Sequence, residues 1–277
     1  STTVLYVALE HPYFYTKSLF DLANEFYKMG GRHLYIDEVH KYFRWARELK
    51  VIYDGLPDLQ IVFSASSALD IYRGEADLSR RVVTYYLPGL SFREYLAFKH
   101  QKKYDRINLA ELPSQAREIS LEVTSNEVVL PLFKDFLRSG YFPFRLEVNE
   151  EQYIQRLFQV INTVIDSDLA YIDGYSTEAS IKIKRLLGVI AESVPYKPNI
   201  SSLARKTMMS RDLIYTYLNH LKKAHLVAFL MQKGKGVATL QKPDKLYLEN
   251  TNLSYALKLK PDPGNLRETF LLNQLTN

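Results

Sequence analysis

The chain has 277 residues, of which 47% are apolar, so it is long enough for about two domains with a sizeable core. It contains no Cys, which excludes disulfides and thiolate metal sites and is compatible with a reducing cytoplasm. No apolar run approaches the roughly 20 residues of a membrane span, and the first residues lack the basic start of a signal peptide. These features predict a cytoplasmic protein with no membrane partner.

The net charge of +5 is unevenly distributed along the chain. Between Ile181 and Lys245, thirteen Lys and Arg stand against three acids, while the remainder carries 23 basic and 28 acidic residues. A basic segment in an otherwise mildly acidic chain indicates a polyanion as the partner of that segment. A solvated charged face would give the same pattern.

The first hundred residues alternate between apolar runs and amphipathic stretches. Helices are expected over residues 16–29 and 44–53, and the strands between and around them are Thr3–Leu9, Leu34–Ile36, Leu59–Phe63 and Val82–Leu87. Apolar runs without alternation suit strands that are buried on both faces of a parallel sheet. The alternation of strands and helices predicts an α/β fold with a parallel, doubly wound sheet.

Two adjacent carboxylates, Asp37 and Glu38, directly follow the second of these runs. Ligands of parallel sheets bind outside the carboxyl ends of the strands, where this pair would emerge. One carboxylate can hold Mg²⁺, and the next can orient an attacking water toward a γ-phosphate. An acidic pair at the end of a strand can also simply cap a following helix, and the pattern alone leaves both interpretations open.

Four further residues suit phosphate chemistry. Ser64 and Ser66 follow the third strand, where a hydroxyl can contact the water or the phosphate, although Ser also caps helices. Arg80 and Arg81 follow a polar loop, and a guanidinium can stabilise the charge of a transferring phosphoryl group, within one chain or from a neighbouring subunit. Two Arg on the surface at a helix end are also common in proteins where they have no catalytic role.

The segment from Leu34 to Leu96, which begins LYIDEVHKYFRWARELK and ends LPGLSFREYL, closely resembles bacterial and archaeal AAA-type ATPases that carry a conserved C-terminal domain of unknown function. In that family a Walker B strand, a Trp-bearing helix, a T-G-S-S sensor turn, an Arg-bearing segment and an L-P-x-L-S-F-R-E-Y element follow in this order. Ala65 departs from the Gly that is usual in the sensor turn. The resemblance implies an ATP hydrolase that uses ATP and Mg²⁺.

The resemblance also assigns roles to the residues already singled out. Asp37 would hold Mg²⁺, and Glu38 would activate the attacking water. Ser64 or Ser66 would sense the phosphate. Arg80 or Arg81 would stabilise the transition state, either within one chain or across the interface of a homo-oligomer.

The phosphate-binding loop is missing from this sequence. No G-x-x-x-x-G-K-[ST] occurs, and Gly234-Lys235-Gly236 lacks both the spacing and a preceding strand. The resembled family carries this loop upstream of a strand like Thr3–Leu9. Because the loop supplies the backbone N–H groups and the Lys that hold the phosphates, we expect a truncated chain that neither binds ATP tightly nor hydrolyses it.

The basic segment has the pattern of a winged helix. Residues 200–227 suggest two helices joined by a turn, with Asn199 or Ser201 capping the first and Ser210 the second. Val227–Met231 and Val237–Leu240 would form the wing. In DNA-binding versions the second helix enters the major groove and the wing reaches the backbone. The candidate DNA contacts are Arg205, Lys206, Ser210, Arg211, Tyr215, Lys222, Lys233 and Lys235. Many winged helices bind proteins instead, which keeps that alternative open.

The predicted domain order is a partial ATPase core (1–100), a helical lid (101–175), the winged helix (176–260) and a first helix of a truncated nuclease-like domain (261–277). In the resembled family a G-x-x-x-E-x-F helix opens a domain like the PD-(D/E)XK nucleases, and its Glu corresponds to Glu268 here. The downstream acid and E-x-K elements are absent, so no nuclease activity is expected.

The sequence therefore predicts an AAA-type ATPase with a DNA-binding module. Because the phosphate-binding loop is missing, this 277-residue chain is expected not to hydrolyse ATP. The alternative is a non-enzymatic regulator that binds DNA or protein and keeps a decayed ATPase core as its scaffold.

Overall fold

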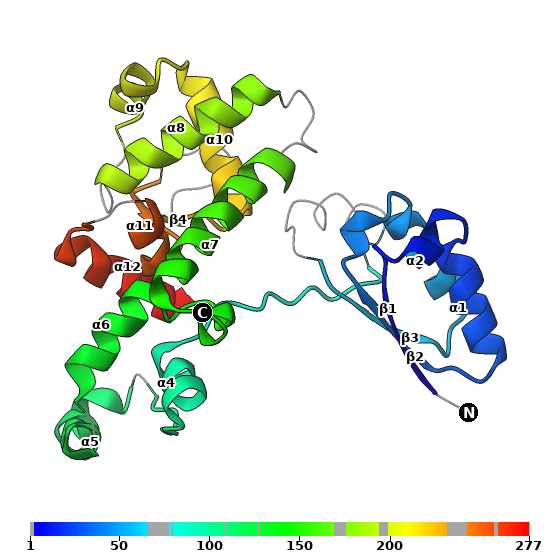
Figure 1. Cartoon of the computed structure of the whole chain (residues 1–277), viewed down its shortest axis with the longest axis horizontal. Coiled ribbons are helices and arrows are strands. Elements are labelled where there is room, and N and C mark those ends of the chain that lie inside the picture. Colours follow the sequence, from blue (N-terminus) through cyan, green and yellow to red (C-terminus); the bar gives the residue numbers. More distant parts are fainter. Residues whose placement is uncertain are drawn as a thin grey trace. The chain divides into compact units, whose positions relative to one another are not determined.

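The computed structural model describes residues 3–65, 78, 80–108, 110–126, 128–168, 176–193, 199–231, 243–257 and 260–276 (Figure 1). The chain divides into two compact units, each described here by itself: unit 1 comprises Ser1–Tyr86 and Asp166–Tyr175, and unit 2 comprises Leu87–Ile165 and Ser176–Asn277. Among the described helices, none combines the length and the apolar character that crossing a membrane requires. The finer division predicted from the sequence stays a prediction.

Unit 1 is built on a parallel sheet of three described strands, in the order β1-β2-β3. The strands are β1 (Val4–Ala8), β2 (His33–Asp37) and β3 (Gln60–Phe63). They are connected by α1 (Leu19–Lys28) and α2 (Trp45–Gly55), with short 3-10 turns at Pro12–Tyr15 (η1) and Val39–Lys41 (η2). The parallel register aligns Val7 with Ile36 and Ile36 with Phe63, so the strands end together at one edge.

One face of this sheet forms the core of unit 1. Leu34 and Ile36 of β2 are almost fully buried, and α1 and α2 cover them with an apolar stripe that includes Leu19, Trp45 and Ile52. The Ser18 side chain caps α1 by accepting a hydrogen bond from the backbone N–H of Asp21. Both connecting helices pack on this same face, which fixes the direction in which the strand ends present their polar residues.

The opposite face of the sheet is exposed, so the predicted burial of these strands on both faces is wrong within the described residues. Tyr6, Tyr35 and Val62 form a row across β1, β2 and β3, and Tyr6 and Val62 are 63% and 57% exposed. Successive side chains of a strand point to opposite faces. An all-apolar run such as Leu34–Ile36 therefore hides an outward-facing residue that hydropathy alone does not reveal.

The predicted fourth strand, Val82–Leu87, is also wrong. These residues form no strand in the structure, and Val83, Tyr85 and Leu87 are largely exposed. β-branched and aromatic residues favour strands only when a neighbouring strand and a packing surface are available. The segment instead spans the boundary between the two units.

Unit 2 is mainly helical. Its described helices are α4 (Phe92–His100), α5 (Leu112–Asn126), α6 (Val129–Ser139), α7 (Glu150–Thr163), α8 (Thr177–Ser193), α9 (Ile200–Thr207), α10 (Arg211–Lys223), α11 (Thr251–Leu257) and α12 (Pro263–Thr276). A 3-10 turn at Pro143–Leu146 (η3) precedes α7, which continues as a π-helical turn at Val164–Asp168. Capping boxes start α4 at Ser91 and α7 at Asn149.

Two short antiparallel strands follow α10. β4 (Val227–Leu230) pairs with β5 (Lys245–Leu248), so that Val227 lies opposite Leu248. The predicted wing strand Val237–Leu240 lies outside the described residues. The winged-helix assignment therefore stays a prediction, although the helices α9 and α10 and the strand β4 lie where the sequence predicts them.

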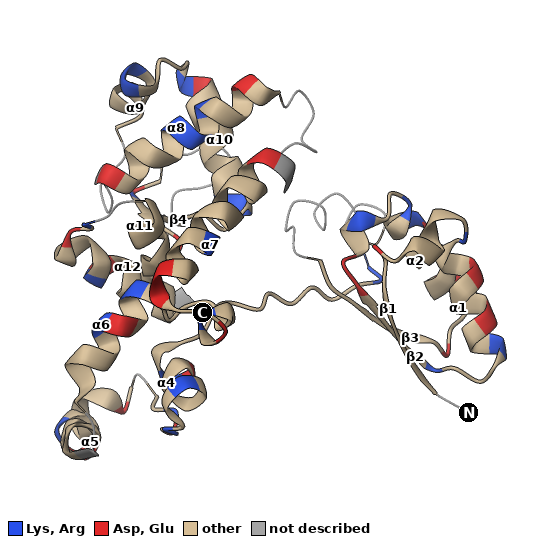
Figure 2. Ribbon diagram, in the orientation of Figure 1, with Lys and Arg blue, Asp and Glu red and all other residues tan. Residues whose placement is uncertain are grey.

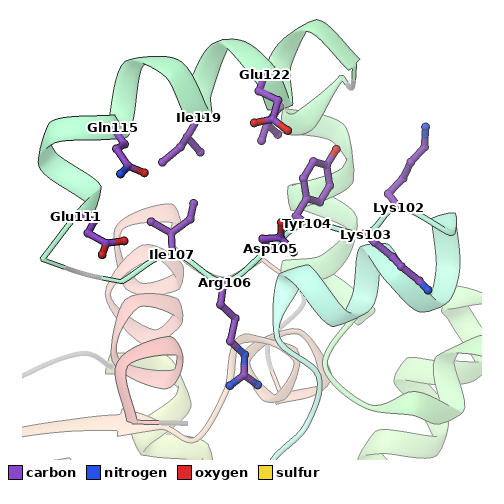
Figure 3. A pocket seen from close by; sticks show the side chains of 11 residues that line it. Lys102, Lys103, Tyr104, Asp105, Arg106, Ile107, Glu111, Gln115, Ile119 and Glu122 are labelled. Atoms are coloured by element: carbon purple, nitrogen blue, oxygen red, sulfur yellow. The ribbon is translucent and has the colours of Figure 1, made fainter.

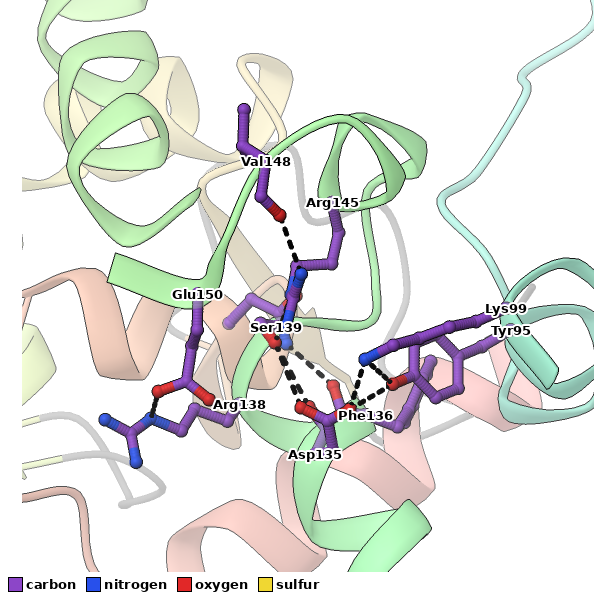
Figure 4. A network of polar contacts seen from close by, with 10 residues as sticks. Tyr95, Lys99, Asp135, Phe136, Arg138, Ser139, Arg145, Val148 and Glu150 are labelled. Atoms are coloured by element: carbon purple, nitrogen blue, oxygen red, sulfur yellow. Dashed lines mark hydrogen bonds and ion pairs between the residues drawn. The ribbon is translucent and has the colours of Figure 1, made fainter. Parts of the chain in front are cut away.

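A polar cluster joins α4 to α6 (Figure 4). The Asp135 carboxylate accepts hydrogen bonds from the Tyr95 hydroxyl and from Lys99 Nζ, the latter at 2.5 Å. Arg145 continues the cluster by donating from Nε to Ser139 Oγ at 2.9 Å. Burial, followed by the bond to Asp135, raises the pKa of Tyr95, so its hydroxyl remains a donor at neutral pH. This cluster is a fully paired structural joint rather than a reactive site.

A buried Asn links four segments of unit 2. Asn252 on α11 is fully buried, and its Oδ1 accepts from the Tyr141 backbone N–H at 2.8 Å and from the Tyr153 hydroxyl at 2.5 Å. Its Nδ2 donates to the carbonyls of Phe136 and Leu137 at 3.1 and 2.8 Å. A single side chain thus ties α11 to α6, to α7 and to the turn between them.

His220 on α10 makes the stability of unit 2 depend on pH. Burial, followed by the charge of Lys223, lowers the pKa of this imidazole below its ordinary value of 6.5. The unfolded chain then binds more protons than the folded one between the two pKa values, so stability is fully present above about pH 6.5 and falls as the pH drops through the folded pKa. We expect the urea midpoint of unfolding to decrease over this range.

The measurement is a series of urea titrations from pH 8 to pH 5. His220→Gln should flatten the dependence, and Lys223→Gln should weaken it in part, because it removes only the second cause. A slope unchanged by His220→Gln would refute the assignment.

Candidate functional site

The acidic pair lies at the carboxyl edge of the sheet of unit 1. Asp37 is the last residue of β2, the middle strand, and its backbone carbonyl accepts from the Leu9 N–H at 3.0 Å. Glu38 follows in a left-handed backbone conformation, with φ of 53°. Few residues other than Gly adopt this region at no cost. The tight turn separates the directions of the two side chains, so that adjacent carboxylates occupy different positions.

Ser64 joins this edge from the end of β3. Its hydroxyl donates to Asp37 Oδ1, and the Glu38 backbone N–H lies 3.2 Å from the same oxygen. The backbones are also linked, because the Val39 N–H donates to the Ser64 carbonyl at 3.0 Å. The structure therefore brings together Asp37, Glu38 and Ser64, three residues predicted from the sequence. Ser66 lies outside the described residues.

Tyr6 is a fourth member of this cluster, and the sequence did not reveal it. Its hydroxyl donates to Asp37 Oδ2 at 2.5 Å across the pair of strands β1 and β2. The two donors hold the pKa of Asp37 below its ordinary range, the Ser64 hydroxyl contributing more than Tyr6. In return, the hydrogen bond to Asp37 raises the pKa of Tyr6. Only the strand register could have predicted this contact, because it sets Tyr6 opposite Tyr35, two residues before Asp37 on the same face of the sheet.

The Glu38 carboxylate points to a different neighbour. Its Oε2 lies 3.1 Å from Nδ1 of His40, whose side chain is almost completely buried, while the Glu38 side chain is 32% exposed. A partly exposed carboxylate beside an imidazole can accept a proton from water. Asp37 and Glu38 therefore differ in environment: the first is held by hydroxyl donors, and the second is open to solvent.

The donor set at this edge suits a hard cation only in part. An ionised carboxylate with a depressed pKa and a neighbouring hydroxyl are oxygen ligands of the kind that Mg²⁺ accepts. Mg²⁺ usually takes one or two carboxylates and completes its shell with waters and substrate phosphates. In the part of the chain that the structure describes, no three His, Asp or Glu residues converge as a metal site would require. Asp37 can therefore hold Mg²⁺ only together with ligands from outside this cluster.

The two arginines behave differently. Arg81 is bound to Asp54 of α2, with Nε and Nη2 at 2.9 and 3.0 Å from the two carboxylate oxygens. Arg80 is exposed and has a left-handed backbone, with φ of 76°. None of the hydrogen bonds and ion pairs within the described residues connects Arg81 to Asp37 or Glu38. A role for either Arg in phosphate chemistry stays a prediction.

In unit 2, the helices α9 and α10 carry the predicted nucleic-acid contacts. Asn199 caps α9 by accepting from the Ser202 N–H, and Ser210 caps α10 by accepting from the Leu213 N–H. Leu203, Ile214 and Leu218 are buried between the helices and α8. This core fixes which side of α10 faces outward.

The outward side carries most of the predicted residues. Arg205, Lys206, Ser210, Arg211 and Lys222 are exposed, and Tyr215 is half-buried. Figure 2 shows Lys and Arg on α8, α9 and α10. Lys222 Nζ also lies 5.2 Å from the centre of the Phe229 ring on β4. Lys233 and Lys235 lie outside the described residues.

The same side of α10 presents polar residues that the charge-based prediction overlooked. Asp212 and Thr216 are exposed and Asn219 is half-buried, and they line up with Arg211 and Tyr215 at helical spacing. Asn and Asp can pair with base edges in the major groove, and Thr can contact either a base or a phosphate. Helical periodicity, applied outward from the buried positions, would have identified them from the sequence.

Glu268 and a hollow in unit 2 carry no recognisable chemistry. Glu268 on α12 accepts from Lys245 Nζ at 2.9 Å and from the Tyr247 hydroxyl at 3.3 Å, so it pairs with β5. A hollow of about 580 Å³ opens between residues 102–107 and α5 (Figure 3). Ile107 and Ile119 face each other across it, whereas Lys103 and Arg106 point away. Among the described residues that line it, no three His, Asp or Glu side chains form a group that could hold a metal ion.

Comparison with known proteins supports part of this assignment. A family model described as an AAA domain matches residues 1–96, and a model described as a domain of unknown function (DUF8612) matches residues 130–263. The first match supports an AAA-type, ATPase-like family and includes Asp37, Glu38 and Ser64. No solved structure matches the chain.

Two curated relatives come from Methanocaldococcus jannaschii. The uncharacterized protein MJ1637 is 23% identical over 254 residues, which cover 88% of this chain and 53% of the relative. The uncharacterized protein MJ1544 is 23% identical over 268 residues, which cover 92% and 56%. The chain thus spans about half the length of the curated relatives that it matches.

Proposed function

We propose that this chain is part of an ATP-hydrolysing AAA-type ATPase that carries a DNA-binding winged helix. The observation that carries the first half is the contact of Asp37 with Ser64 at the carboxyl ends of neighbouring parallel strands, with Glu38 beside them. A metal-binding acid, a water-activating acid and a phosphate-sensing hydroxyl need this proximity. The AAA-domain match over residues 1–96 supports the same reading.

In this proposal each residue of the cluster has a separate task. Asp37, kept ionised by Ser64 and Tyr6, would hold Mg²⁺. The metal would neutralise charge on the phosphates. Glu38, partly exposed beside His40, would take a proton from the attacking water. Ser64 would contact both the acid and the phosphate. Arg80 is the better candidate to stabilise the transition state, because Arg81 is bound to Asp54.

The missing phosphate loop favours a second candidate function for this 277-residue chain. The sequence contains no G-x-x-x-x-G-K-[ST], so no loop of this kind supplies the N–H groups and the Lys that hold a triphosphate. The second candidate is a DNA- or protein-binding regulator whose ATPase core serves as a scaffold. The presence or absence of such a loop in the residues encoded upstream of Ser1 distinguishes the two candidates.

A calorimetric titration with MgATP tests the consequence for this polypeptide. We expect no binding in the micromolar range, because a carboxylate and a hydroxyl cannot replace the phosphate-binding loop. The full-length gene product, titrated in parallel, is the control, and it should bind if it contains the loop. Micromolar MgATP binding by the 277-residue chain would contradict the expectation.

The proposal of DNA as partner rests on the outward side of α9 and α10. The basic residues there would contact phosphates, and the short polar residues of α10 would meet base edges in the major groove. Duplex binding should weaken steeply with salt, because each neutralised phosphate adds a slope of about 0.9 to the dependence on log salt. No binding of duplex DNA at low salt would exclude this partner.

Two substitutions separate the expected kinds of contact. Arg211→Ala should weaken binding of the preferred sequence by about 1–3 kcal/mol and relax the preference at one position. Lys206→Ala should weaken all sequences alike and reduce the salt slope by about 1. Fluorescence anisotropy with duplexes chosen by selection measures both. Arg117→Ala on the exposed side of α5 is the matched control and should change neither.

A further inference from the structure

Unit 1 carries a second surface feature, which shares no residue with the acidic cluster. A hollow of about 680 Å³ opens beside α2 and the start of α1. It is lined by Ser18, Phe20, Phe43, Arg44, Arg47, Glu48 and Val51. None of these residues belongs to the proposed nucleotide site or to α9 and α10, so neither of the proposed functions accounts for this surface.

Phe43 is the most unusual residue of this hollow. Its side chain is 98% exposed, although the chain is anchored on both sides of it. Trp45 is buried in the core, and the Tyr42 hydroxyl donates to Glu48 at 2.8 Å. The backbone at Phe43 is therefore held in place while the ring projects into solvent. An exposed Phe on a fixed backbone is a typical anchor for a binding partner, because little ordering is needed on association.

Within the part of the chain that the structure describes, the positive charges beside the hollow are not paired. Both oxygens of the Glu48 carboxylate are used internally, since Oε1 accepts from Tyr42 and Oε2 accepts from the Phe20 backbone N–H at 3.0 Å. Arg44 and Arg47 are exposed, and neither forms an ion pair with any of the described residues. The hollow thus offers apolar walls, formed by Phe20 and Val51, next to two guanidinium groups that have no counter-ion among the residues described for this unit.

We propose that this hollow binds an acidic segment of a partner protein that also carries a large apolar side chain. Its carboxylates would pair with Arg44 and Arg47, and its apolar side chain would pack against Phe43 and Val51. Arg and aromatic residues dominate the energetics of protein interfaces. Bidentate pairing with carboxylates is the contact for which the guanidinium group is best suited.

Two other occupants fit the observations less well. A nucleic acid needs a basic track along its backbone, yet residues 1–86 carry ten basic and eleven acidic residues. A second copy of the chain, related by a two-fold axis, would set the same patch against itself. The guanidinium groups of both copies would then meet, while Glu48 remains committed to its internal donors.

The test is a selection of displayed random peptides against the complete chain. We expect the enriched peptides to combine Asp or Glu with Trp, Phe or Leu, and a labelled peptide from this set to bind in an anisotropy assay. Phe43→Ala and Arg47→Glu should each weaken that peptide at least about tenfold, which corresponds to the loss of one anchoring contact. Lys28→Glu, on the exposed end of α1, is the matched charge control and should leave the affinity unchanged.

The variants should unfold at the same urea concentration as the unmodified protein, because the Phe43 side chain touches little of the core. The absence of enriched peptides, or the enrichment of peptides without acidic residues, would overturn the proposal. So would equal peptide binding by Phe43→Ala, or displacement of the peptide by a single-stranded oligonucleotide. Sedimentation showing a dimer that Phe43→Ala abolishes would overturn it in favour of a second copy.

Discussion

Replacing Glu38 by Gln in the full-length gene product is expected to lower the rate of ATP hydrolysis by about 100-fold or more, the usual contribution of a positioned general base. The affinity for MgATP should stay within about twofold, because the substitution preserves the size of the side chain and removes only its ability to take a proton. The structure is the reason to expect a change in turnover without a change in affinity. The hydroxyls of Tyr6 and Ser64 donate to Asp37, the proposed Mg²⁺ ligand, whereas the Glu38 carboxylate lies beside His40.

The measurement pairs a steady-state phosphate-release assay with calorimetry. Glu25→Gln, an exposed carboxylate on α1, is the matched control and should retain both turnover and binding. Asp37→Asn should differ from Glu38→Gln by weakening the Mg²⁺ dependence of binding as well. Full turnover in Glu38→Gln would show that another residue activates the water, and a full-length product without any turnover would favour the scaffold function.

Replacing Asn252 by Ala is expected to destabilise unit 2 strongly. The substitution removes an acceptor for the Tyr141 N–H and the Tyr153 hydroxyl, and a donor for the Phe136 and Leu137 carbonyls. A buried group left without its partner costs about 1–3 kcal/mol, so we expect the free energy of unfolding to fall by about 3–5 kcal/mol once some groups find water. Such a loss is a large fraction of the stability of an ordinary domain.

Urea unfolding followed by circular dichroism measures this change. Asn108→Ala is the matched control, because that side chain is exposed and makes one hydrogen bond of 3.3 Å to Glu111; its effect should stay within about 0.5 kcal/mol. Asn252→Asp should also be damaging, since it keeps the acceptor but loses the donor to two carbonyls. A loss below about 1 kcal/mol in Asn252→Ala would mean that the four hydrogen bonds do not act as a joint.

The sequence determined much of unit 1 and of the site. Apolar runs, helical spacing and Gly positions located β1, β2, β3, α1 and α2 to within a few residues, because these signals are local. Asp37, Glu38 and Ser64 were also predictable, since residues directly after parallel strands meet at the same edge of the sheet. The basic segment and the caps of α9 and α10 were equally readable from residue type and spacing.

Other features were decided only by the tertiary structure. Which face of the sheet is covered depends on where the connecting helices pack, so the exposed row of Tyr6, Tyr35 and Val62 could not be read from hydropathy. The segment Val82–Leu87 has the composition of a strand but found no partner in the described structure. The contact of Tyr6 with Asp37 and the joint at Asn252 connect residues 31 and more than 90 positions apart. Such pairings depend on how segments far apart in the sequence pack together, so a pattern read within one segment does not reveal them.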